Sequence, residues 1–164
     1  MPTRPATRDD LRVIAAIYRH YVETSVATFE LDPPDADEWG RRFASISQAG
    51  LPFLVTERGG EVAGYAYCAA WKTRPAYRAT VEDSIYVAPT AVGQGCGTEL
   101  LRDLLDACGA AGIREVIAVI ADTGDPASVG LHRRFAFVDA GRLTRVGYKH
   151  DRYVDTTLMQ RSLA

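Results

Sequence analysis

Apolar residues recur at helical spacing near the N-terminus. The first such segment begins at Thr7, and Asp10 stands three residues later, where a carboxylate can accept the returning hydrogen bond of a helix cap. Spacings of three, four and seven residues place apolar side chains along one side of a helix. The residues with this spacing are Leu11, Ile14, Ala15, Tyr18, Tyr21 and Val22.

A second helical segment follows Pro34, where Asp35 or Asp37 can cap the first turn. Gly50 is suited to end this helix, because glycine favours the left-handed conformation that follows a last turn. Its apolar side is formed by Trp39, Phe43 and Ile46. The chain is therefore expected to begin with two amphipathic helices.

Strand patterns follow these helices. The segments 53–57 and 61–71 flank Gly59-Gly60, a pair that suits a hairpin turn because glycine adopts positive φ at little cost. A third segment, 80–87, is rich in β-branched residues and is closed by Pro89. These patterns predict a hairpin followed by a third strand.

Helix and strand patterns alternate in the second half. A helix is predicted over 98–108, and Ala110 and Gly112 break it. The nearly uninterrupted apolar segment 115–121 is typical of a central strand buried on both faces. The remaining predictions are a helix over 126–135 and strands over 137–143 and 153–163.

This order predicts an α+β fold, a mixed α/β arrangement with a central, mostly antiparallel sheet of six to seven strands and about four flanking helices. The unit from 80 to 121 is expected to be a parallel strand–helix–strand crossover with the right-handed connection such units adopt. The 164 residues suit a single domain. Hydrophobic residues make up 47% and charged residues 24%, which argues against disorder or a bare coiled coil.

Charge and cysteine content narrow the function. A net charge of -2 does not suit a general nucleic-acid binder or a polybasic membrane-surface protein. There is no apolar run long enough to span a membrane and no signal-peptide core at the start. Three cysteines without metal-ligand spacing indicate buried, reduced thiols and no metal site. The expected location is the cytoplasm, and no nucleic-acid or membrane partner is expected.

A glycine-rich turn follows the strand that ends near Pro89. Gly93, Gly95 and Gly97 alternate just before the helix at 98–108. Backbone N–H groups can converge there without Cβ atoms in the way, and the helix start adds unpaired donors and a positive dipole end. The turn therefore favours a phosphate or pyrophosphate. It lacks the Lys-Ser or Lys-Thr pair of a Walker A loop and the spacing of a dinucleotide fingerprint.

The strand, the glycine-rich turn and the helix together resemble the acetyl-CoA motif of the GNAT N-acetyltransferase superfamily. A longer resemblance, to phosphinothricin and methionine sulfoximine acetyltransferases, runs from about residue 3 to residue 163. Its motifs are Thr28-Phe29-Glu30, Trp71-Lys72-Thr73-Arg74-Pro75-Ala76-Tyr77, Thr80-Val81-Glu82, Ile85-Tyr86-Val87, Leu131-His132 with Phe137, and Gly147-Tyr148-Lys149-His150 with Asp155.

The resemblance implies an acetyl-CoA site. The pantetheine arm would pair with the backbone of Ile85, Tyr86 and Val87, and the pyrophosphate would bind the turn formed by Gly93, Gln94, Gly95, Cys96, Gly97 and Thr98. The family often has Gln or Arg where this chain has Val92, and commonly has Asn, which contacts the cofactor, where it has Asp125. Either Asp125 or Ser128 could take that contact. The motif Phe135-Ala136-Phe137 also lacks its usual central glycine.

Acetyl transfer to an amine needs a base, because an ammonium group must lose a proton before it can attack. The resemblance implies that Glu82 is this base, acting directly or through water. Strand alternation places Glu82 and Asp83 on opposite faces, and a bulge could turn the Asp83 carboxylate away from the apolar side. His132 lies seven residues after Asp125, where many GNAT enzymes have a tyrosine near the CoA sulfur. The resemblance therefore implies that His132 could give a proton to the departing thiolate, and the alternative is a histidine on a helix surface.

The acceptor site implied by the resemblance lies near the segment before Glu82. Cationic donors there could hold an α-carboxylate or a phosphinate, unless the segment is only a solvated basic loop. The residues assigned to it are Lys72, Thr73, Arg74, Tyr77 and Arg78, with Phe29 and Trp71 as an apolar wall. His20 and His150 are interpreted as structural, and Lys149 receives no catalytic role.

The leading function is N-acetylation of a small amino acid or analogue, with acetyl-CoA as co-substrate and without a metal. The alternatives are acetylation of a protein N-terminus or lysine, and an acyl-CoA-binding module without catalysis. The resemblance also implies a homodimer.

Overall fold

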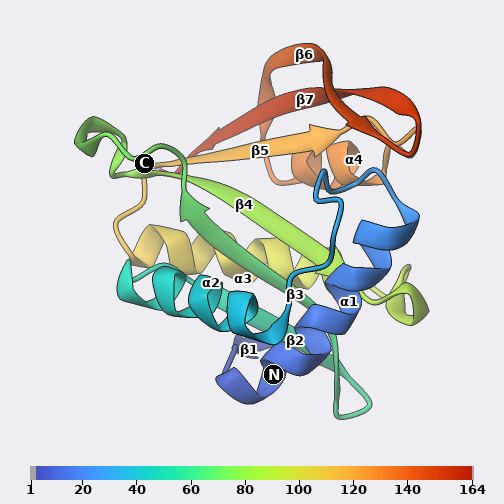
Figure 1. Cartoon of the computed structure of the whole chain (residues 1–164). Coiled ribbons are helices and arrows are strands. Elements are labelled where there is room, and N and C mark those ends of the chain that lie inside the picture. The colour runs from blue at the N-terminus through green and yellow to red at the C-terminus, as the bar shows by residue number, and fades with distance from the viewer. Residues whose placement is uncertain (1–2, 164) are drawn as a thin grey trace.

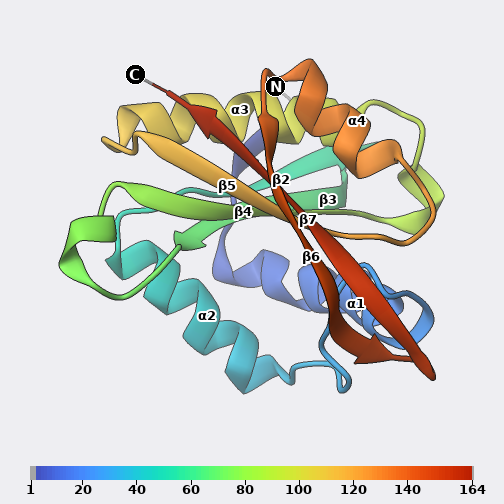
Figure 2. The same ribbon diagram turned by 90° about the horizontal axis from the view of Figure 1, so that it is seen from above.

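The computed structural model describes residues 3–163. They form a seven-stranded sheet in the order β1-β2-β3-β4-β5-β7-β6, with two helices on each side (Figures 1 and 2). The helices are α1 (Leu11–Thr24), α2 (Ala36–Gln48), α3 (Cys96–Ala110) and α4 (Ala127–Arg134). The strands are β1 (Thr3–Pro5), β2 (Phe53–Arg58), β3 (Glu61–Ala70), β4 (Thr80–Val87), β5 (Glu115–Ala121), β6 (Val138–Lys149) and β7 (Arg152–Ser162). The predicted α+β fold is confirmed.

The helix starts follow from local capping. The Asp10 carboxylate accepts the Thr7 N–H at 2.7 Å, and a short 3-10 turn, Arg8–Asp10, precedes α1. Asp35 accepts the Glu38 N–H at 2.8 Å and caps α2. Of the two capping residues considered for α2, the structure therefore selects Asp35.

Strand pairing is antiparallel throughout the described sheet except between β4 and β5, where the pairs run from Thr80–Glu115 to Glu82–Ile117 in parallel. This is the predicted crossover, with α3 as its helix. The short strand β1, which pairs with β2, was not predicted, since three residues carry too little pattern. β6 is also longer than predicted, because it continues through an irregular, exposed stretch that lacks an apolar alternation.

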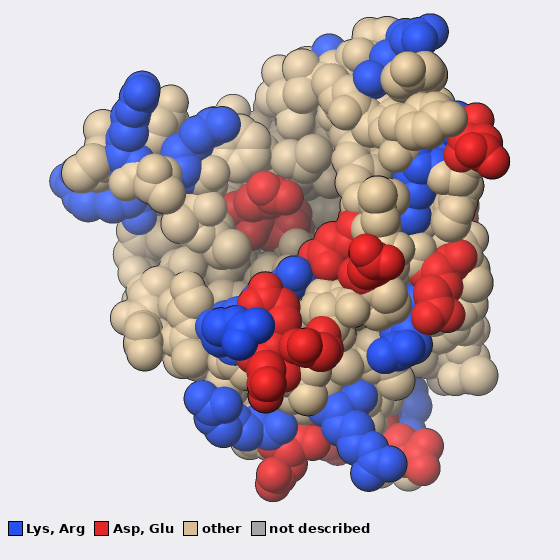
Figure 3. Space-filling model, viewed as in Figure 1, with Lys and Arg blue, Asp and Glu red and all other residues tan. Residues whose placement is uncertain are grey.

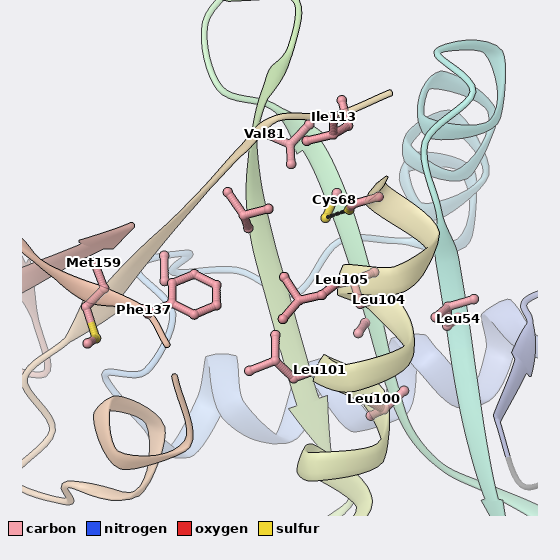
Figure 4. Close-up of a cluster of buried hydrophobic side chains, with 14 residues drawn as sticks. Leu54, Cys68, Val81, Leu100, Leu101, Leu104, Leu105, Ile113, Phe137 and Met159 are labelled. Carbon is pink, nitrogen blue, oxygen red and sulfur yellow. Dashed lines mark hydrogen bonds between the residues drawn. The ribbon is translucent and has the colours of Figure 1, made fainter. Parts of the chain in front are cut away.

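The main core lies between the sheet and α3 (Figure 4). Its largest contribution from the helix is the row Leu100, Leu101, Leu104 and Leu105. Cys68 and Cys108 are fully buried there as free thiols, with their sulfur atoms 3.0 Å apart, and Cys96 is buried nearby. The expectation that the cysteines are buried apolar residues is confirmed. Within residues 3–163, no helix has the length and apolarity that crossing a membrane requires.

The second core lies on the opposite side of the sheet, under α1 and α2. Trp39 of α2 and Tyr18 of α1 meet edge to face at 5.5 Å between ring centroids, and Trp39 also contacts Tyr65 of β3. The central strand β5 departs from its prediction. Val119 is 36% exposed, so β5 is not buried on both faces, and the exposed part opens onto a cavity.

Candidate active site

The site begins where β4 and β5 separate. Pairing stops after Glu82, although β4 continues to Val87 and β5 to Ala121. Backbone groups of alternate residues point to opposite edges of a strand. The Ala88 N–H donates to Ala63 of β3, so the even-numbered residues of β4 face β3. Ile85 and Val87 therefore direct their N–H and C=O groups into the gap, and Tyr86 directs its own toward β3.

A cavity of about 1000 Å³ occupies this gap and extends toward α1 on one side and α4 on the other. Its walls include the ends of β4 and β5, the start of α4 and the connection between α1 and α2. Figure 3 shows the molecule hollowed at this place, with acidic side chains in and around the hollow. An extended acyl carrier can pair with the free edge of β4 in such a gap, as a strand adds to an open sheet edge.

The glycine-rich turn lies at the α3 end of the gap. Gly93 and Gly95 have φ values of 84° and 83°, a conformation that favours glycine, and Gly95 is the N-cap of α3. The N–H groups of Cys96, Gly97 and Thr98 belong to the first helical turn, so they have no partner within the helix. These backbone donors fit the phosphate role expected from the sequence.

The structure brings most of the predicted cofactor residues together. Ile85, Tyr86, Val87, Gly97, Asp125 and Ser128 all line the cavity. Gly93, Gln94, Gly95, Cys96 and Thr98 do not line it, but Val92 and Gly97 of the same turn do. The Cys96 side chain is buried against Ala63 and Ala91, so only its backbone can face a ligand.

Arg58 of β2 holds this turn in place. Its guanidinium donates to the Gln94 carbonyl at 2.8 Å and to the Glu99 carboxylate at 3.1 Å. Sequence analysis did not assign this residue, because β2 and the turn are far apart in the chain. An arginine so engaged orders the turn rather than supplying free charge.

Glu82 lines the cavity on the side of α1 and α2. Its face is shared with Ser84 and Tyr86, since these alternate residues point the same way. Burial raises the pKa of Glu82, the nearby Asp83 charge raises it further, and the Lys72 charge opposes this in part. A carboxyl group with a raised pKa is a stronger base toward an ammonium proton than an ordinary one.

Asp83 stays on the opposite face of β4. The register with β3 runs without a shift from Val81 to Val87, so the bulge considered for Asp83 is wrong. The carboxylate is 7% exposed and pairs with His132 of α4, whose Nε2 lies 2.7 Å from Asp83 Oδ2. A buried charged group is tolerated when it is paired in this way, which removes the need for a bulge.

His132 is not a surface histidine, since it is 4% exposed and lines the cavity. Its Nδ1 lies 2.7 Å from the Ser128 carbonyl, which can only accept, so Nδ1 carries a hydrogen. Burial alone lowers the pKa of His132, but the Asp83 hydrogen bond and charge, with the Ser128 carbonyl, outweigh it and the pKa is raised. The pair therefore favours a protonated ring.

The acceptor residues separate into two groups. Phe29 lines the cavity, with Thr28 and Glu30 beside it. The predicted residues Lys72, Thr73, Arg74, Tyr77 and Arg78 are all exposed on the connection between β3 and β4 and are not part of the cavity wall. Basic side chains gather at that end of the molecule in Figure 3.

Sequence analysis missed an aromatic wall on the Glu82 side of the cavity. Tyr18 and Tyr21 of α1 and Tyr67 of β3 line it. The Tyr21 hydroxyl also donates to the Val87 carbonyl. Helical spacing alone placed Tyr18 and Tyr21 on the apolar side of the first helix. Their polar hydroxyl groups were the available signal for a site.

The beginning of α4 places Asp125 at the cavity. Its Oδ1 accepts the Ala127 N–H at 2.9 Å, two residues further on, which forms an Asx turn just before the helix. Asp125 and Ser128 are both exposed at this wall. The Asp125 carboxylate therefore accepts a backbone hydrogen bond at the start of α4. An asparagine amide at this position would accept the same bond and would also carry N–H donors for a ligand.

Comparisons with known proteins agree with this geometry. Residues 14–137 match the acetyltransferase (GNAT) family. The chain is 50% identical over 155 residues to a phosphinothricin N-acetyltransferase of Alcaligenes faecalis, covering 94% of this chain and 79% of that protein. It is 37% identical over 161 residues to an L-methionine sulfoximine/L-methionine sulfone acetyltransferase of Pseudomonas aeruginosa, covering 98% and 93%.

The fold matches a solved structure equally well. A GNAT superfamily phosphinothricin acetyltransferase from Sinorhizobium meliloti, in complex with AcCoA, has a TM-score of 0.95 and 44% identity, covering 100% of this chain and 90% of that one. The resemblance noted in the sequence is thereby confirmed. Because the family matches most of the length of this chain and the relatives are similar over nearly all of it, the chain belongs to the GNAT family of acetyltransferases.

Proposed function

We propose that this enzyme transfers the acetyl group of acetyl-CoA to the amino group of a small amino acid or analogue, of the phosphinothricin or methionine sulfoximine type. The names of its relatives support this substrate class. The observation that carries the proposal is the position of Glu82, a partly buried carboxylate with a raised pKa, in the same cavity as the free edge of β4.

Glu82 takes a proton from the acceptor ammonium, which frees the nitrogen lone pair. The nitrogen then bonds to the acetyl carbon, and the carbon–sulfur bond breaks with its electron pair on sulfur. The nitrogen loses its second proton to solvent as the neutral amide forms. The backbone N–H and C=O of Ile85 and the N–H of Val87 hold the carrier arm, since the Val87 carbonyl already accepts the Tyr21 hydroxyl. The turn before α3 holds the phosphates. The chain thus supplies orientation and one proton acceptor.

His132 is assigned the proton for the departing thiolate. Its Nδ1 hydrogen is bound to a backbone carbonyl, so the proton it can release is the one on Nε2. The Nε2 hydrogen bond to Asp83 breaks as that proton passes to the thiolate. Glu82 and His132 lie on opposite sides of β4. The base therefore meets the acceptor on the α1 side, and the acid lies on the α4 side.

The basic connection between β3 and β4 is assigned to the acid group of the acceptor. Lys72 lies close enough for its charge to lower the pKa of Glu82, so this segment borders the reaction site although it is outside the cavity wall. Arg74 and Arg78 extend from the same exposed segment and can bind a carboxylate or phosphinate. Phe29 supplies an apolar surface for the substrate side chain.

A thiol-release assay tests the proposal. Acetyl-CoA is incubated with free amino acids, phosphinothricin and methionine sulfoximine, and with the methyl ester and amide of each active compound. We expect activity with the free acids and at least about a tenfold loss in kcat/KM with the esters, because each lost charged hydrogen bond costs about 1.5–3 kcal/mol. Equal activity with esters would contradict recognition of the acid group.

One similar structure favours a second candidate, a protein acetyltransferase. A protein from Brucella melitensis described as a ribosomal-protein-alanine N-acetyltransferase has a TM-score of 0.95 and 34% identity, covering 99% of both chains. Peptides with free N-terminal alanine, and peptides with lysine behind a blocked N-terminus, are added to the assay. Activity confined to peptides would replace the first proposal, and no thiol release with any acceptor would support a binding module.

We propose a cytoplasmic homodimer as the working form of the enzyme. The three free, buried thiols suit a reducing compartment. The family resemblance supports the dimer, and exposed apolar side chains on β6, Val138, Leu143 and Val146, offer surface for it. Light scattering coupled to size exclusion gives the mass in solution, and cell fractionation gives the location.

A further inference from the structure

Only two residues of β6 are buried, Gly147 and Lys149. β6 is the last strand of the sheet order, and the rest of it is exposed. Residues two apart on a strand point to the same face. Both of these contact the connection between α1 and α2, residues 25–35, which approaches the β6–β7 hairpin in Figures 1 and 2.

The contact at Gly147 is with the ring of Phe29. A Cβ atom at position 147 would lie 2.4 Å, 2.5 Å and 2.8 Å from three carbons of that ring. Phe29 therefore lies directly against the backbone of β6, in space that only glycine leaves free. The same ring lines the cavity, so it is positioned between β6 and the cavity.

The contact at Lys149 is with Thr28. The Lys149 side chain is 3% exposed, and its ammonium donates to the Thr28 carbonyl at 2.8 Å. Burial lowers the pKa of Lys149, while the Glu30 charge opposes this. No carboxylate within residues 3–163 forms an ion pair with it at 4 Å or less. The buried cation is thus committed to one backbone carbonyl.

The opposite side of the connection is fixed as well. The Thr28 hydroxyl lies 2.6 Å from the Tyr18 hydroxyl of α1, and Glu30 pairs with Arg42 of α2 at 2.7 Å. The connection is therefore held between the two helices and β6. Within the connection, the Phe29 ring is the part that lies against the backbone of β6 at Gly147.

We infer that Gly147 and Lys149, on the edge strand β6, are specificity-determining residues for the acceptor. Gly147 sets how far the Phe29 ring extends into the cavity, and Lys149 fixes the position of the backbone at Thr28. This rests on the proposed function, since the acceptor is taken to bind beside Phe29. Any larger residue at 147 displaces the ring away from β6 and toward the acceptor. Neither residue contacts the free edge of β4 or the phosphate turn.

The test compares Gly147→Ala, Lys149→Met and Phe29→Leu with the double variant Gly147→Ala/Phe29→Leu. Gly109→Ala, where an added Cβ meets nothing within 4 Å, is the matched control. We expect Gly147→Ala to raise the acceptor KM at least about tenfold, because small displacements in a site cost up to 10²-fold. Lys149→Met should raise it severalfold, with the acetyl-CoA KM within about twofold in both.

The double variant distinguishes an effect that acts through the Phe29 ring from a general loss of structure. In a Phe29→Leu background, the Gly147→Ala change should have little further effect, because the ring it displaces is gone. Additive effects, or an unchanged acceptor KM in Gly147→Ala, would overturn the inference.

A fluorine spectrum gives a readout that does not depend on the acceptor. The chain has five phenylalanines, so 4-fluorophenylalanine labelling gives five resonances, and Phe29→Leu identifies that of Phe29. Gly147→Ala should shift this resonance with no acceptor present. An unchanged resonance would contradict the inference that Gly147 positions the Phe29 ring. If wild type acetylates no amino acid but the resonance shifts, the proposed function fails and the Phe29 contact stands.

Discussion

His132 of α4 and Asp83 of β4 form a buried pair on the α4 side of the sheet, with 2.7 Å between Nε2 and Oδ2. The pair joins α4 to β4, the strand that carries Glu82 on its other face. Because Nδ1 is bound to the Ser128 carbonyl, a proton remains between Nε2 and the carboxylate. The protonation of this site is therefore linked to the stability of the fold.

Asp83→Asn should remove a pH-dependent part of the stability. The raised pKa of His132 stabilises the fold fully below about pH 6.5, the ordinary histidine value, and this contribution is lost as pH rises through the raised value. We expect the free energy of unfolding of the wild type to fall over that interval more steeply than that of Asp83→Asn. Urea unfolding between pH 6 and pH 9 measures both.

Asp139→Asn is the control for this substitution, since Asp139 is exposed and pairs with Arg133 of the same helix as His132. It should keep the wild-type slope. Equal slopes for Asp83→Asn and wild type would show that the pair does not hold the proton.

Glu82→Gln should lower kcat at neutral pH at least about tenfold, since general bases contribute about 10²–10⁴-fold. The acetyl-CoA KM should change little, because Glu82 is remote from the phosphate turn. In the wild type, kcat/KM should rise with pH through the raised pKa of Glu82, and this acid limb should vanish in the variant. Thiol release across pH measures it. Turnover equal to that of Glu61→Gln, an exposed control, would remove Glu82 from the mechanism.

Asp125→Asn should lower the acetyl-CoA KM. The amide keeps the oxygen that accepts the Ala127 N–H and gains a donor at the cavity wall. One added hydrogen bond of about 0.5–1.5 kcal/mol corresponds to about a 2–10-fold change. Initial rates at varied acetyl-CoA give the KM, with Asp122→Asn, outside the cavity wall, as control. A KM that rises would show that the carboxylate itself favours the carrier.

Ala136→Gly should stabilise the fold. Ala136 has φ of 63°, which costs a residue with a Cβ about 1–2 kcal/mol, and glycine avoids most of this cost. A net gain near 1 kcal/mol raises Tm by about 2–4 °C in a chain of this size. Ala107→Gly, inside α3, should lower Tm instead. A lower Tm for Ala136→Gly would contradict the strain.

Much of this architecture could be predicted from the chain. The leucine row of α3 is visible as a helical repeat, and the alternation of β4 assigns Glu82 and Asp83 to the opposite faces that they occupy. What could not be predicted depends on contacts between distant segments. The Asp83–His132 pair joins residues 49 apart, and the Lys149–Thr28 contact joins residues 121 apart. No local pattern signals either one.

The separation of β4 from β5 has a mechanical consequence. Only three residue pairs join strands β1–β4 to the β5–β7–β6 half of the described sheet, so backbone pairing across the middle of the sheet is short. A ligand that lies in the gap between β4 and β5 pairs with the edge of β4 and contacts residues of β5. Saturation with CoA should therefore raise the melting temperature and slow amide exchange in both halves of the sheet, because the bound ligand connects them.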